Sequence, residues 1–213
     1  MPHAPRLDPD TSVLVRLAAA IAAGEEHALR EVMSEARRAG LRSEWMDELL
    51  LQSILMVGYP RALLAFGLWR SLSGIAAPEA DADASYDRTA EWEARGTETC
   101  QRVYGANYAR LRENVRALHP AADAWMLVEG YGRTLSRSGL DLKRRELCTV
   151  AQTAVLDTPR QLHSHLRGAL HAGATIAEVE GALVCAKAFM TPAGRGAAHD
   201  VWAAVRGGRT AES

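Results

Sequence analysis

Hydrophobic positions recur every three or four residues along most of the chain, which is the spacing of an amphipathic α-helix. Good helix formers such as Ala, Leu, Arg and Glu fill the positions between them, and alternating runs of β-branched residues are absent. The pattern therefore predicts an all-α fold.

Glycine and proline divide the first part of this pattern into four helices. We expect the first helix to begin near Thr11, the third to be capped by Ser43, and the fourth to have Pro60 at its first helical position. Residues 1–74 therefore form a predicted N-terminal helical half. Its four helices cover residues 11–24, 25–40, 43–58 and 60–74.

Residues 75–85 are small and acidic and include Pro78, which predicts a linker. Residues 86–213 then form a second helical domain, which we expect to pack with the first half as one compact unit. Gly130 and Gly132 make one of its helices irregular. The predicted helices cover residues 85–105, 107–120, 121–139, 142–156, 158–173, 175–190 and 192–202.

Three helices of the second domain have a predicted side-chain cap at the N-terminus. Asp141 caps one of them. Thr158 and Gln161 form a predicted capping box, and Thr175 and Glu178 form a second. These caps set the expected starts of the helices at residues 142, 159 and 176.

Residues 36–66 and 170–200 share a weak internal similarity, which predicts a duplicated two-helix unit. In this alignment Val32 takes the place of His165, so a site that uses this histidine belongs to the second half. The matched pairs are Ala39–Gly40 with Ala172–Gly173, Glu44 with Glu178, Leu49 with Leu183 and Arg61 with Arg195.

Charge and cysteine content narrow the function classes. The 25 basic and 26 acidic residues are scattered, so the chain lacks the basic face that nucleic-acid binding requires. No apolar run has the length of a membrane span, and residues 1–12 lack the basic and apolar parts of a leader. We expect a cytoplasmic protein that binds neither nucleic acid nor membrane. The three cysteines, Cys100, Cys148 and Cys185, have no metal-binding spacing, which predicts reduced thiols and no metal site.

The stretch RELCTVAQTAVLDTPRQLHSHLRG, residues 145–168, combines acid, thiol and imidazole groups on two predicted helices. His163 and His165 lie on opposite borders of the second helix's apolar stripe, and Glu146 and Cys148 flank the stripe of the first helix. A carboxylate that meets an imidazole here would form a proton-transfer couple. Periodicity alone does not choose between the two histidines. The alternative is that Glu146 pairs with a surface arginine.

The longer segment SRSGLDLKRRELCTVAQTAVLDTPRQLHSHLRGALHAGATIAEVEGAL resembles the signature of the carboxymuconolactone decarboxylase family, which includes the alkylhydroperoxidase D-type proteins. The resemblance covers about residues 125–205, with GL, REL, HLRGAL and AGAT in the family order. It implies an alkylhydroperoxidase D-like helical bundle in which the first half is a diverged internal repeat. It also implies a homo-oligomer, either a dimer, a trimer or a hexamer.

The family contains two chemistries, which differ at the start of the histidine-bearing helix. Its peroxidase members have a CxxC pair there, and the corresponding positions in this chain are Thr158 and Gln161. Glu146 and His165 match the family's glutamate and histidine positions. The resemblance therefore implies a decarboxylase-type enzyme, whose lactone chemistry needs no metal or organic cofactor.

By the same resemblance, the substrate is a small carboxylated lactone or a related organic acid. We expect His165 to deliver a proton after carbon dioxide leaves, and Glu146 to orient and charge His165. Arg167 or Arg137 is expected to hold the anionic substrate, because a guanidinium binds a carboxylate through two hydrogen bonds. The remaining candidates for substrate contact or pocket lining are His163, Tyr131 and Arg133.

Two other functions stay open at this point. Cys148 could serve a one-cysteine thiol peroxidase in which His165 promotes the thiolate. The alternative for this cysteine is a small core residue. The chain could also be a non-catalytic oligomeric or ligand-binding module that keeps the family fold.

Overall fold

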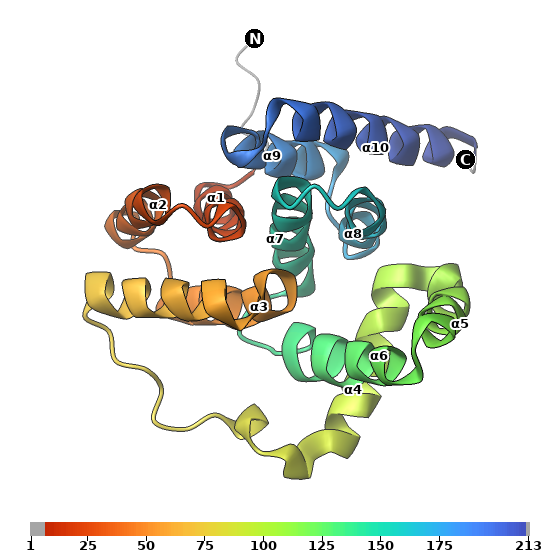
Figure 1. The fold of residues 1–213 in the computed structure, drawn as a ribbon, viewed down its shortest axis with the longest axis horizontal. Helices are drawn as coiled ribbons and strands as arrows, with labels where there is room; N and C mark the ends of the chain where they lie inside the picture. The colour runs from red at the N-terminus through yellow and green to blue at the C-terminus, as the bar shows by residue number, and fades with distance from the viewer. Residues whose placement is uncertain (1–6, 212–213) are drawn as a thin grey trace.

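The structure is a computed structural model that describes residues 7–211, with the side chains of residues 7–208. Residues 1–6, which belong to the stretch considered above for a leader, lie outside the described residues, as do residues 212–213. The described part of the chain consists of helices and connecting segments without a β-strand (Figure 1). This confirms the predicted all-α fold.

The first half contains α1 (Pro9–Ala23), α2 (Glu26–Arg38) and α3 (Ser43–Ser73). α1 begins two residues before Thr11, because Asp8 accepts a hydrogen bond from the Thr11 backbone N–H at 2.9 Å. The predicted Ser43 cap is wrong: Ser43 is already helical, and Arg42 precedes it without a side-chain cap. Asp8 therefore caps α1, whereas α3 begins without a side-chain cap.

The helices predicted over residues 43–58 and 60–74 join end to end in α3. Gly58 has φ 71° and ψ 171°, which is not helical, and therefore kinks α3 at the predicted boundary. By length and composition α3 could cross a membrane, and 33% of its most apolar window is buried within the protein. Because core helices of soluble proteins have the same properties, α3 by itself does not indicate a membrane span.

The acidic segment after α3 contains two short turns of 3₁₀ helix, η1 (Ala82–Ala84) and η2 (Tyr86–Arg88). Asp83 is buried and accepts hydrogen bonds from Trp92 at 2.8 Å and from Arg95 at 2.8 Å. Arg137 also pairs with Asp83, at 3.2 Å. This part of the predicted linker is therefore held against the helices that follow it.

Next come α4 (Thr89–Tyr104), η3 (Gly105–Asn107), α5 (Tyr108–Leu118) and α6 (Pro120–Trp125). α6 continues into the π-helical η4 (Met126–Leu135), where the sequence predicted irregularity. α4 and η4 cross in close contact: a Cβ on Gly132 would lie 1.9 Å from the Trp92 carbonyl oxygen, and one on Gly96 would lie 2.3 Å from that of Leu127. These two glycines therefore let the two backbones touch.

The last part contains α7 (Leu142–Val155), α8 (Pro159–His171), α9 (Ile176–Ala186), η5 (Lys187–Phe189) and α10 (Pro192–Ala211). The Asp141 cap and the Thr175–Glu178 capping box are confirmed. The predicted Thr158–Gln161 capping box is wrong, because the Thr158 hydroxyl donates to the Thr153 carbonyl at 3.2 Å. The last helix also extends past the predicted end at residue 202.

α7 lies at the centre of the bundle, between α1 and α8, while α9 and α10 cover one end (Figure 1). Every residue from Arg145 to Ala154 on α7 is buried. One apolar cluster includes side chains from both halves, among them Leu14, Met46 and Leu147. A charged residue on α7 is therefore enclosed by packed helices on several sides.

Candidate functional site

Glu146 and His165, on the consecutive helices α7 and α8, meet inside the bundle. His165 Nδ1 lies 2.9 Å from Glu146 Oε2, across nineteen residues of sequence. Glu146 is fully buried and His165 is 7% exposed. The structure therefore brings together the carboxylate and the imidazole that the family resemblance had paired, a choice that periodicity alone did not make.

The close approach of the two helices depends on Gly168, one turn after His165. A Cβ on Gly168 would lie 2.5 Å from Glu146 Oε2 and 2.7 Å from a methyl group of Val103 on α4. Any larger residue at this position would displace the carboxylate. The sequence analysis missed Gly168, although a glycine within a predicted helix is a signal of close backbone contact.

Glu146 and His165 each retain one polar atom without a protein partner. Glu146 Oε1 is enclosed and has no hydrogen-bond partner among the described residues. His165 Nε2 has no hydrogen-bond partner there either, but it is not one of the enclosed polar atoms. The ring therefore uses Nδ1 toward the buried carboxylate and presents Nε2 toward solvent. This is the arrangement of an oriented general acid or base.

Two tyrosines lie close to this couple. Tyr131 on η4 is buried, and its ring centroid is 6.0 Å from that of Tyr104 on α4. Burial, with an added contribution from the charge of Glu146, raises the pKa of Tyr104 to about 12. Burial likewise holds the pKa of Tyr131 well above 10, so both hydroxyls stay protonated at neutral pH. The sequence predicted a role for Tyr131 but missed Tyr104, which belongs to no motif.

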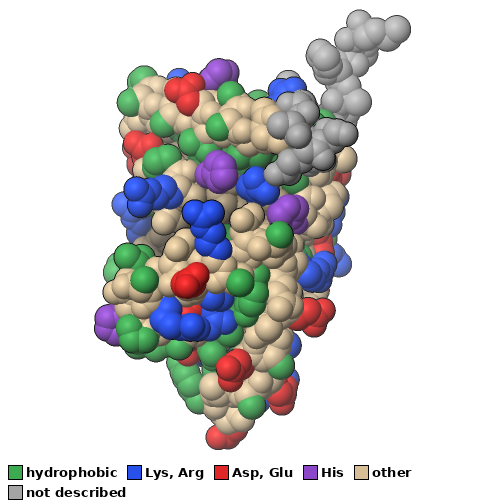
Figure 2. Space-filling model, turned by 90° about the vertical axis from the view of Figure 1, so that its right-hand side faces the viewer, with side chains coloured by type: hydrophobic (Ala, Val, Ile, Leu, Met, Phe, Trp, Pro, Cys, Tyr) green, Lys and Arg blue, Asp and Glu red, His purple; other side chains and the backbone are tan. Residues whose placement is uncertain are grey.

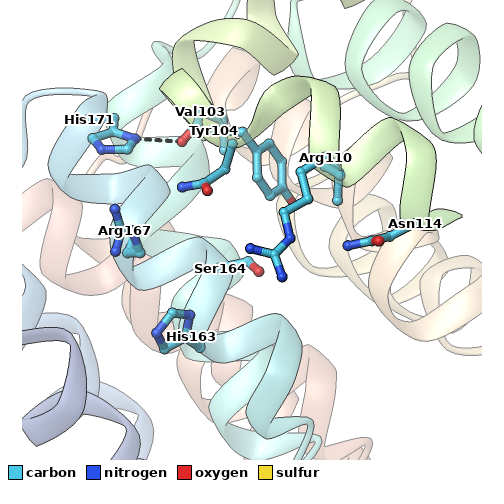
Figure 3. A pocket seen from close by; sticks show the side chains of 10 residues that line it. Val103, Tyr104, Arg110, Asn114, His163, Ser164, Arg167 and His171 are labelled. Atoms are coloured by element: carbon cyan, nitrogen blue, oxygen red, sulfur yellow. Dashed lines mark hydrogen bonds between the residues drawn. The ribbon is translucent and has the colours of Figure 1, made fainter. Parts of the chain in front are cut away.

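His163 and Arg167 line a different surface of α8. Residues two positions apart on a helix point about 200° apart, so these side chains lie opposite His165. They border a pocket of about 360 Å³ between α8 and the α4–α5 region, together with Tyr104, Arg110 and His171 (Figure 3). Neither Glu146 nor His165 lines this pocket. The structure therefore does not bring His163 and Arg167 to the imidazole that was expected to share a substrate with them.

Arg137 and Arg133 lie in a third place, beside the acidic segment 75–85. Arg137 forms ion pairs with Glu48 at 2.9 Å and Asp81 at 2.7 Å. The Arg133 guanidinium stacks over the rings of Tyr86 and Trp92 and pairs with Glu129. Because carboxylates of the protein already occupy these arginines, the structure does not bring them to the Glu146–His165 couple.

The thiols are held in their neutral form. Cys148 is fully buried, and burial raises its pKa far above the usual value. Burial also raises the pKa of Cys100 to about 12. A peroxidatic cysteine needs an accessible thiolate, and Cys148 meets neither condition. Its surroundings are those of a small core residue.

Arg145, in the REL motif, contacts an element of the first half instead of the site. It is fully buried, and its Nη2 atom donates to Glu48 Oε2 on α3 at 2.6 Å. Its guanidinium also donates to the carbonyl oxygens of Leu140 and Arg137. Arg145 thus secures α7 to α3 while its neighbour Glu146 points toward α8.

Comparison with known proteins was made by family and by sequence. The chain matches the model of the carboxymuconolactone decarboxylase family over residues 3–71 and 120–206, more than half of its length. No curated protein matches the chain significantly. The two matched segments fit the predicted internal repeat, and the second contains both Glu146 and His165. Residues 72–119, which include α4 and α5, fall outside the match. The chain therefore belongs to the carboxymuconolactone decarboxylase family.

Proposed function

We propose that this protein is a cofactor-independent acid–base lyase that decarboxylates a small carboxylated lactone or a related organic acid. The observation that carries the proposal is the buried 2.9 Å contact between Glu146 and His165, with Nε2 of the imidazole left free. A carboxylate on one ring nitrogen fixes the tautomer and orientation of the ring, and the other nitrogen then exchanges protons with a substrate.

The proposed reaction breaks the bond between the substrate's carboxylate carbon and the adjacent carbon. Carbon dioxide leaves, and the electron pair is delocalised into the substrate's own conjugated system, which takes the role of an electron sink. Protonated His165 then donates the Nε2 proton to carbon, and solvent restores it. The negative charge of Glu146 stabilises the imidazolium form in the ground state.

We expect the substrate to reach Nε2 from the side of α8 that carries Gln161. Glu146, Gly168 and the core of α7 enclose the inner side of the imidazole. Gln161 is exposed and lies one helical turn before His165 on the same face of α8. We therefore place the substrate beside Gln161. This is also one of the two positions at which the family's peroxidases have cysteine.

The thiol peroxidase alternative has little support. Its candidate thiol, Cys148, is fully buried and has a strongly raised pKa, and residues 158 and 161 are not cysteines. Cys100 is also buried, and burial raises its pKa to about 12. A non-catalytic module remains as an outcome of the test described next.

The test is turnover of carboxylated muconolactones by purified protein, measured as released carbon dioxide. We expect His165→Ala to lower kcat by about 100-fold or more, which is the contribution of a general acid. Glu146→Gln should also lower kcat, because it removes the charge that supports the imidazolium. His27→Ala, an exposed histidine on α2, is the matched control and should turn over like wild type.

Two results would contradict the proposal. Equal kcat for wild type and His165→Ala would remove the assigned proton donor. Absence of carbon dioxide release across a panel of carboxylated lactones and related acids would favour the non-catalytic module. Circular dichroism melting of each variant separates loss of chemistry from loss of fold.

A further inference from the structure

The pocket between α8 and the α4–α5 region is lined by positively charged and neutral side chains. Its volume is about 360 Å³, and no aspartate or glutamate is among its lining residues. Hydrogen-bond donors line it from both sides: Arg110, Asn107 and Asn114 from η3 and α5, and Arg167, His163 and Ser164 from α8. Such a lining favours a negatively charged ligand.

Its two arginines have no partner among the residues that the structure describes. Neither Arg110 nor Arg167 forms an ion pair or a hydrogen bond with any described residue. Two other arginines on α5 behave differently: Arg112 and Arg116 both bind the buried carboxylate of Asp123. Of the three arginines on α5, Arg110 therefore has no ion pair with a described carboxylate, and its side chain lines the pocket.

The side chains converge on the same hollow from two elements. Figure 3 shows the Arg110 guanidinium directed across the pocket toward Ser164 on α8, with Asn114 beside Arg110 and with His163 and Arg167 on the opposite wall. Figure 2 shows a band of arginine and histidine side chains on this face of the molecule, below the C-terminal helix. His171 is fixed at the edge, where its Nδ1 lies 2.7 Å from the Val103 carbonyl oxygen.

We propose that this pocket binds a small molecule through a phosphate group. A phosphate carries about −1.5 to −2 charges at neutral pH and three strong acceptor oxygens, which match two guanidinium groups and several amide and hydroxyl donors. A single carboxylate has one charge and two oxygens, so it would neutralise only one of the two guanidinium groups.

Neither Glu146 nor His165 lines the proposed phosphate site. His163 and Arg167 face away from His165 on α8, and Val103 and Tyr104 of the pocket floor lie on α4. The α5 wall belongs to residues 72–119, outside the family match. The pocket is therefore a feature that this chain adds to the matched helices, and its function does not depend on the proposed decarboxylation.

The test is isothermal titration calorimetry with inorganic phosphate, with acetate at equal ionic strength as the monoanionic comparison. We expect Arg110→Gln and Arg167→Gln each to weaken phosphate binding by about tenfold or more, because each removes a charge-assisted hydrogen bond. Arg160→Gln is the matched control, since Arg160 is exposed on α8 and does not line the pocket.

Several results would overturn the proposal. They are the absence of saturable phosphate binding, equal affinity in Arg110→Gln, Arg167→Gln and Arg160→Gln, and acetate binding as tight as phosphate. Asn114→Ala, a small change at an exposed position, provides a second variant with little risk to folding, and should weaken phosphate binding several-fold.

Discussion

At the scale of single residues, the site depends on Gly168, which has no side chain. Gly168 lets α8 approach Glu146 and Val103 to a distance that no Cβ would allow. The carboxylate that results is fully buried, with one oxygen on His165 and the other without a partner among the described residues. Such a group is costly to bury, which is typical of a residue kept for its chemistry.

We expect Gly168→Ala to lower the free energy of unfolding by about 1–3 kcal/mol, because the new methyl group overlaps Glu146 and Val103. Urea unfolding measures this change. Gly196→Ala on α10 is the control: a Cβ there meets nothing within 4 Å, so alanine should stabilise the helix slightly. Equal stability of the two variants would contradict the close contact.

A second prediction at this scale concerns Cys100. Burial raises the pKa of its thiol from 9.0 to about 12, so the unfolded chain ionises this group at a lower pH than the folded protein does. Folded stability is complete below about pH 9 and falls as the pH rises toward 12, by about 1 kcal/mol per pH unit from this thiol. Urea unfolding at pH 8, 9 and 10 should show a smaller fall in Cys100→Ala than in wild type. Parallel curves would exclude this thiol as a cause.

At the scale of elements, α7 connects the site to the rest of the bundle. Arg145 binds Glu48 on α3, and the next residue, Glu146, binds His165 on α8. Gln52 on α3 adds hydrogen bonds to the Arg145 carbonyl and to Thr149. The orientation of the carboxylate therefore rests on contacts that begin in the first half of the chain.

We expect Arg145→Ala to lower the free energy of unfolding by about 3 kcal/mol or more, because it leaves a cavity and deprives the buried Glu48 of one partner. Arg160→Ala, an exposed arginine on α8, should change it by less than about 0.5 kcal/mol. Chemical unfolding of both variants checks the difference. A small effect at Arg145 would mean that Arg137 alone satisfies Glu48.

Helix positions were largely predictable from the sequence, because periodicity and end signals are local. The structure confirms the Asp141 cap and the Thr175–Glu178 capping box. It also confirms an interruption of the helix at Gly58, although the two predicted helices join there in α3. The Thr158 cap was wrong because its hydroxyl has a competing acceptor in the preceding helix, the carbonyl of Thr153. Such competition depends on turn geometry that residue types do not specify.

At the scale of the whole molecule, α3 exposes an apolar surface to solvent. Leu55, Tyr59, Leu63 and Leu64 are exposed on either side of the kink in α3, and Tyr59 and Leu63 are 62% and 61% exposed. Large exposed apolar patches are typical of interaction surfaces. The homo-oligomer that the family resemblance implies would bury such a surface, so the expectation of an oligomer can be tested at α3.

We therefore expect Leu63→Glu to shift the protein toward monomer, because a charge at a buried contact is left without a partner. Size-exclusion chromatography with light scattering measures the mass directly. Leu118→Glu is the control, since Leu118 is exposed at the end of α5, away from α3. An unchanged mass in Leu63→Glu would place the association elsewhere.

The local pattern of residues was enough to predict the helices and part of their caps, since each depends on neighbours within a few turns. The pairing of Glu146 with His165 came from the family resemblance, because the local pattern did not choose between His163 and His165. The local pattern also did not anticipate Gly168, or that acidic residues of the segment 75–85 would occupy Arg137. These outcomes depend on which helices pack together and at what distance. That distance arises from contacts between residues far apart in the chain, so it became visible only in the folded arrangement.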